Sequence, residues 1–141
     1  MHFACDSDCT KPAQWRGVVL PFGAPETASQ RGIGLAFDAQ NATHVGYRTW
    51  LSTSHARCDA NCDLNANWVV KELLSADSLN SSIPWANPCT QGTWAFESGF
   101  GTGVTPQGTL VSNQDIVSYG SGGVCTESHA FEYQSLLVMA P

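Results

Sequence analysis

The chain of 141 residues is short enough for one domain and carries few charged side chains. Charged residues make up 13% of the chain, about half of the share in an ordinary soluble domain. The net charge of −6 argues against nucleic acids and anionic membranes as partners, because both attract basic proteins. No apolar run in the sequence reaches the about 18 residues that a membrane span requires. We therefore expect a globular domain with no nucleic-acid partner and no membrane span.

The predicted secondary structure, in chain order, is a series of short strands. Apolar residues alternate with small or polar ones at residues 3–5, 33–37 and 45–49, and a further extended segment covers residues 15–20. Residues 38–42, with the sequence Asp-Ala-Gln-Asn-Ala, form a turn between two of these segments. This arrangement predicts a β-hairpin over residues 33–49.

The only window with a helical composition lies at residues 68–79. The corresponding window after Trp15 contains Pro21 and Pro25, which disfavour a helix, so both windows are expected to be extended. The 13 glycines and 7 prolines fit a chain with many turns. Together these features predict an all-β domain.

A motif of His, two Cys and Trp occurs twice in the first half of the chain, 53 residues apart. Its two copies are His2, Cys5, Cys9 and Trp15, and then His55, Cys58, Cys62 and Trp68. A fainter third copy resembles residues 43–57 and runs from Asp115 to Phe131. The copies predict one repeat-built domain over residues 1–141, with units at about 1–53 and at 54–77 continuing at 103–141. The extra length is assigned to an insertion at about 78–102.

The segments Gly34–Asp38 and His44–Tyr47, followed by the second Cys and Trp copy, resemble repeats of bacterial exported β-propellers, relatives of the sialidase-like (BNR) propellers. The resemblance implies a propeller-type repeat of four-stranded antiparallel blades, linked by disulfides. The chain holds about 2–3 such blades, whereas propellers close with about 4–8. It is therefore part of a larger propeller, a subunit of a homo-oligomeric ring, or a smaller open structure.

The even number of cysteines, six, and the scarcity of lysine indicate disulfides and a secreted or cell-surface protein. The predicted pairs are Cys5–Cys9 and Cys58–Cys62, which leaves Cys89–Cys125 as the third. The C-x3-C spacing also fits a structural zinc site, which is the alternative.

Two groups of residues are candidates for metal binding. Asp59, Asn61 and Asp63 place side-chain oxygens at alternating positions, which fits a calcium loop, with an Asn- and Asp-rich turn as the alternative. His55 recurs with the motif in all three copies, which favours hydrogen bonding on a strand face over a metal cluster. No cofactor is expected other than calcium.

The tryptophans divide into two groups. Trp15 and Trp68 recur with the motif and are expected to pack between repeats. The candidate ligand-binding residues are not repeated and combine indole rings with amides, as in sites that bind sugars: Trp50, Trp85, Asn87, Gln91 and Trp94. Packing of these tryptophans around Cys89 is the alternative.

The sequence thus favours a secreted, non-catalytic binding module that recognises a glycan. The competing hypothesis is a self-assembling surface or filament subunit whose repeats bind neighbouring copies. A further alternative is a fragment of a sialidase-like hydrolase, which would need a cluster of arginines and a Tyr/Glu pair. The chain has four arginines and one adjacent Glu132–Tyr133 pair. Neighbouring residues of a strand point to opposite faces, which disfavours catalysis by that pair.

Overall fold

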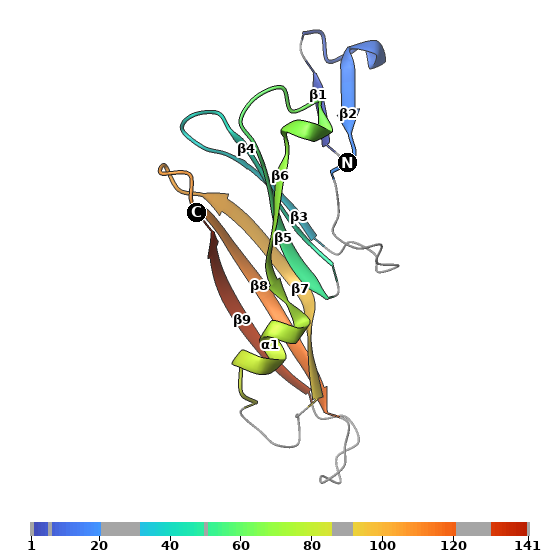
Figure 1. Ribbon diagram of the computed structural model, residues 1–141. Helices are drawn as coiled ribbons and strands as arrows, with labels where there is room; N and C mark the ends of the chain where they lie inside the picture. The colour runs from blue at the N-terminus through green and yellow to red at the C-terminus, as the bar shows by residue number, and fades with distance from the viewer. Residues whose placement is uncertain are drawn as a thin grey trace.

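The computed structural model describes residues 2–5, 7–20, 32–49, 51–85, 92–120 and 131–140, and it is mostly β (Figure 1). The described strands form three antiparallel sheets in which strands that follow one another in the chain are paired. The sheets contain two, four and three strands: β1 (His2–Cys5) and β2 (Trp15–Val18); β3 (Gly32–Phe37), β4 (Thr43–Arg48), β5 (Ser52–Cys58) and β6 (Val69–Ser75); β7 (Gly92–Val104), β8 (Leu110–Gly120) and β9 (Phe131–Ala140). Three short helices are η1 (Pro12–Gln14), η2 (Asn65–Asn67) and α1 (Ala76–Ser82).

The predicted hairpin is formed by β3 and β4, and its turn is built around Asp38. The Asp38 carboxylate accepts hydrogen bonds from the backbone N–H groups of Gln40 (2.9 Å) and Ala42 (2.8 Å). Asn41 takes the left-handed conformation, with φ of 63°, which asparagine tolerates better than most residues. The local chemistry of residues 38–42 therefore sets the hairpin register, in which Phe37 pairs with Thr43.

The repeated motif has the same structure in both copies. Each copy contains a strand, a disulfide loop, a 3₁₀ turn and a second strand antiparallel to the first, with the disulfides Cys5–Cys9 and Cys58–Cys62. The indole N–H of Trp15 donates to the carbonyl of Cys9 at 3.0 Å, and that of Trp68 donates to the carbonyl of Cys62 at 2.9 Å. The two local disulfides are thus confirmed, and in each copy the indole closes the disulfide loop.

One face of the four-stranded sheet, which we call the apolar face, carries much of the hydrophobic core. Val45, Tyr47 and Ala56 lie on this face and pack with Val18 and Leu20 from the segment at the end of β2. Trp68 joins the same cluster and is buried, as expected, whereas Trp15 is exposed. The first copy of the motif therefore covers the apolar face over β4 and β5.

The opposite face of this sheet, which we call the glycine face, packs closely on β7. A Cβ atom at Gly34 would lie 2.4 Å from Cβ of Thr102, and one at Gly32 would lie 2.7 Å from Cβ of Phe100. A Cβ at Gly46 would also meet Thr102, at 2.7 Å. Only glycine allows the two sheets to approach so closely, so these positions determine the packing of β3 and β4 on β7.

A second core lies where α1 packs on the three-stranded sheet. Leu79 of α1 is buried with Trp94, Phe96 and Ile116. The helix begins at a capping box in which Ser75 Oγ accepts from the Ser78 N–H while Ser78 Oγ accepts from the Ser75 N–H. The expectation of an extended chain at residues 68–79 is right for β6 and wrong from residue 76 onward, because this cap starts a helix.

The structure bears on two sequence expectations about the overall architecture. The segment 78–102, assigned to an insertion, contains most of α1 and of β7, and β7 is an integral strand of the third sheet. The described residues contain a four-stranded antiparallel sheet, but their three sheets do not close into a ring (Figure 1). No helix in the described part of the chain is long and apolar enough to cross a membrane.

Candidate functional site

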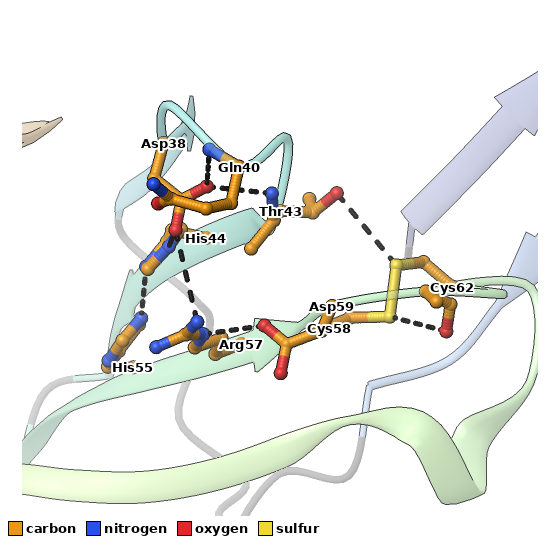
Figure 2. A network of polar contacts seen from close by, with 11 residues as sticks. Asp38, Gln40, Thr43, His44, His55, Arg57, Cys58, Asp59 and Cys62 are labelled. Carbon is orange, nitrogen blue, oxygen red and sulfur yellow. Dashed lines mark hydrogen bonds and ion pairs between the residues drawn. A yellow bond between two sulfur atoms is a disulfide. The ribbon is translucent and has the colours of Figure 1, made fainter. Parts of the chain in front are cut away.

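The most concentrated group of titratable side chains lies on the glycine face, at the β3–β4 turn. Asp38 Oδ2 lies 3.2 Å from His44 Nε2, and His44 Nδ1 lies 3.0 Å from His55 Nε2 (Figure 2). The two imidazole rings stack, with centroids 5.1 Å apart and planes inclined by 9°. All three residues are buried.

The chemistry of the carboxylate fixes the direction of one hydrogen bond in this chain of groups. An ionised carboxylate only accepts hydrogen bonds, so His44 donates from Nε2 to Asp38. His44 Nδ1 and His55 Nε2 share the second hydrogen bond, and the tautomers of the two rings set which of them donates. The result is a relay of two imidazoles on one buried carboxylate.

The electrostatics of the site keep the carboxyl ionised and His55 neutral. Burial opposes ionisation of Asp38, but hydrogen bonds from Ala42, His44 and Gln40 outweigh it and hold the pKa of Asp38 below its usual value. Burial lowers the pKa of His55 to about 4, and electrostatic interactions with His44, Arg57 and Lys71 act in the same direction. His55 is therefore neutral at physiological pH.

The site is closed toward solvent by neighbouring elements. Arg57 Nη2 lies 3.9 Å from Asp38 Oδ2, and its Nε donates to Asp59 at 2.8 Å (Figure 2). Gly108, in the β7–β8 turn with φ of +83°, lies so close that a Cβ atom there would be 3.4 Å from Asp38 Oδ2. The β7–β8 turn therefore lies against the Asp38 carboxylate, and the four-stranded sheet and the three-stranded sheet are in contact at this site.

The candidate calcium residues are not assembled around a common point. Asp59 accepts from Arg57, whereas Asp63 forms an ion pair with Arg16 at 2.8 Å. Asn61 is exposed in a turn, with φ of 52°. Within the described ranges no group of three or more His, Cys, Asp or Glu side chains could hold a metal. The two carboxylates therefore bind arginines, and the Arg16–Asp63 pair links the two copies of the motif.

Trp85 and Trp94, two of the candidate ligand-binding residues, stack on each other with ring centroids 6.0 Å apart. Trp94 is fully buried, and its indole N–H donates to the Ile83 carbonyl at 3.1 Å. Trp85 is half-buried and donates to Ser118 Oγ at 2.9 Å. Trp94 thus has no exposed ring face for a sugar, which corrects its assignment to a ligand site.

The other candidates fall outside what the structure describes. Trp50, Asn87 and Gln91 lie outside the described residues, as do Cys89 and Cys125 of the third predicted disulfide. Among the recurring histidines, the expected hydrogen bonding on a strand face is confirmed for His55. For His44, its partner, the sequence indicates only a place in the strand segment His44–Tyr47 and gives no signal of the contact with His55.

In the part of the chain that the structure describes, β3 and β9 each carry neighbouring exposed apolar side chains. Ile33, Leu35 and Phe37 lie on the apolar face of β3 and are 57%, 53% and 61% exposed. On β9, Leu137 and Met139 are 68% and 64% exposed. The strict alternation Gly-Ile-Gly-Leu-Ala-Phe in β3 is the sequence signal for the first surface, since successive residues of a strand point to opposite faces.

Comparisons with known proteins leave the interpretation to the structure itself. No family model, no curated protein and no solved structure matches this chain.

Proposed function

We propose that this chain is an extracellular, non-catalytic scaffold module of propeller-type repeats whose exposed sheet faces bind protein surfaces. The observation that carries the proposal is the exposure of Ile33, Leu35 and Phe37 side by side on one strand. Contiguous apolar side chains at a surface mark interaction sites. The clustered carboxylate and imidazoles of Asp38, His44 and His55, in contrast, are buried.

The architecture supports the extracellular and repeat-built parts of the proposal. Two disulfides close the motif loops, as in proteins that work in oxidising surroundings. The sheet β3–β6 is a four-stranded antiparallel unit of the size of a propeller blade, and β1–β2 repeats the second half of that unit. A scaffold role fits a chain in which residues 2–18 and 55–71 build the same structure.

The geometry favours protein surfaces over glycans as ligands. A sugar-binding indole must present one ring face to solvent. Trp94 is fully buried, and Trp85 lies against it with its N–H bonded to Ser118. Both rings therefore support the core below α1.

The hydrolase alternative would need arginines that grip a substrate carboxylate. Arg16 and Arg57 form ion pairs with Asp63 and Asp59, and Arg48 is buried. These three guanidinium groups are paired within the protein or buried in it, which supports a scaffold over a hydrolase.

A glycan array separates the scaffold from the lectin. The wild-type chain and Trp85→Ala are applied to the array at equal concentration, and circular dichroism verifies that the variant is folded. The scaffold function predicts no saturable binding to any sugar by either protein. Saturable binding that Trp85→Ala weakens at least about tenfold would overturn the proposal.

A further inference from the structure

The contact between β3 and β7 supplies a template for how two sheets of this chain pack. Both are edge strands of their sheets. Side chains at alternate positions of β7, Phe100 and Thr102, occupy the space over two glycines at alternate positions of β3, Gly32 and Gly34. The internal interface therefore places large side chains of one edge strand on glycines of another.

The same two strands present the same two kinds of surface on their opposite sides, where no other described element packs on them. The far side of β3 carries the larger side chains Ile33, Leu35 and Phe37, all exposed. The far side of β7 carries Gly101 and Gly103, both exposed, and a Cβ atom at either would meet nothing within 4 Å among the described residues. One edge strand thus has exposed large side chains and the other has exposed glycines.

The surface around these two glycines also carries exposed apolar side chains on β9, the opposite edge strand of the sheet. We call it the flat face: β7 contributes Gly101 and Gly103, β8 contributes Val111 and the exposed Asn113, and β9 contributes Leu137 and Met139. Gly103 pairs with Val111, and Val111 pairs with Met139, so these residues lie in one row across the sheet. Since Met139 is 64% exposed, this row offers an apolar platform.

We propose that a second copy of this chain binds here, with the β3 side chains Ile33, Leu35 and Phe37 of one copy on the flat face of the next. This inference rests on the proposed function, and it names the protein surface that the scaffold binds. The contact repeats between copies the packing that Phe100 and Thr102 make on Gly32 and Gly34 within each copy. It joins two different surfaces, so it is heterologous and extends into a ring or a filament.

The described residues of one copy cover the apolar face only in part. Val18 and Leu20 cover Val45, Tyr47 and Ala56 over β4 and β5. The neighbouring strand β3, which pairs with β4 in the same sheet, keeps its side chains on this face exposed. A second copy on β3 continues an existing core, which is the reason to prefer it over an unrelated partner.

Charge sets the salt dependence of this association. Each copy carries a net charge of −6, so copies repel one another at long range. Salt screens that repulsion and leaves the burial of apolar side chains intact. Self-association is therefore expected to strengthen as the salt concentration rises.

The test uses sedimentation velocity of the whole chain and three variants. Leu35→Lys places a charge on the β3 surface, and Gly103→Trp fills the flat face at a position whose backbone accepts a side chain. Val69→Lys is the matched control, because Val69 is 72% exposed on the same sheet and lies in register with Arg57, on the glycine face. Circular dichroism and thermal unfolding establish that all variants are folded.

The expected result is that the wild type and Val69→Lys self-associate, and that Leu35→Lys and Gly103→Trp each weaken association at least about tenfold. In an equal mixture, the flat face of Leu35→Lys and the β3 surface of Gly103→Trp are both intact. The mixture should therefore form a dimer and no larger species.

A wild type that sediments as a monomer at all concentrations and salt levels would overturn the inference while leaving the proposed function open to other protein surfaces. Self-association that neither Leu35→Lys nor Gly103→Trp weakens would also overturn it. A mixture that stays monomeric, while the wild type associates, would refute the heterologous geometry. Sugar binding that depends on Trp85 would instead refute the proposed function.

Discussion

Protonation of His55 should destabilise the fold at mildly acidic pH. The pKa of His55 is lowered from 6.5 to about 4 in the folded chain, mainly by burial. As the pH falls below 6.5, His55 binds a proton in the unfolded chain but not in the folded chain. The free energy of unfolding is therefore highest above pH 6.5 and declines toward pH 4. A shift of this size corresponds to a loss of about 3 kcal/mol in the free energy of unfolding.

The assay is urea unfolding followed by tryptophan fluorescence between pH 4 and pH 7, on the wild type and His55→Gln. Glutamine keeps an N–H donor for His44 but does not titrate, so the difference between the two proteins isolates His55. Asp38 has its pKa held below 3.8, and its contribution is lost only below this window. The pH dependence of the wild type should exceed that of the variant by about 3 kcal/mol over the window. Equal pH dependence in the two proteins would refute the buried relay.

Three further predictions concern packing and covalent structure. Gly34→Ala forces a Cβ atom against Thr102 and should lower the free energy of unfolding in urea by about 1–3 kcal/mol. Gly101→Ala places its Cβ in open space and should change the free energy of unfolding by less than about 0.5 kcal/mol. Equal effects of the two substitutions would contradict the sheet packing. Replacing Cys58 and Cys62 together by alanine opens a five-residue loop and should lower the free energy of unfolding by about 2 kcal/mol, and an unchanged urea midpoint would contradict this. Gly108→Ala is strained at its positive φ and should lower the stability by at least about 1 kcal/mol; a thermal melting curve identical to that of the wild type would be inconsistent with the turn.

Local chemistry made part of the fold predictable from the sequence. The Asp-Ala-Gln-Asn-Ala turn fixes its own geometry through the Asp38 carboxylate and the left-handed Asn41, so the hairpin was predicted correctly. The repeated Cys and Trp motif was correct for a similar reason, because its disulfide and its indole hydrogen bond join residues close in sequence. The cap at Ser75 is equally local, and it was missed because a serine pair is a weaker capping signal than Ser with Glu.

Contacts between distant segments were not predictable in the same way. The alternation in β3 shows which residues share a face, but it does not reveal that Thr102 lies opposite Gly34. The Trp94 side chain was assigned to a ligand site because it stands among polar residues in the sequence. Its burial depends on Leu79, which α1 brings onto the three-stranded sheet. The candidate site therefore had to be located in the structure.

Self-association of the wild-type chain is tested most directly by its native mass, measured by light scattering under non-reducing conditions. We expect the mass to rise above 15.1 kDa as the protein concentration increases, and to rise further at higher salt. This result would mean that the surfaces exposed on β3 and β7 bind each other in solution. A mass that stays at 15.1 kDa at every concentration and salt level would contradict self-association through these faces.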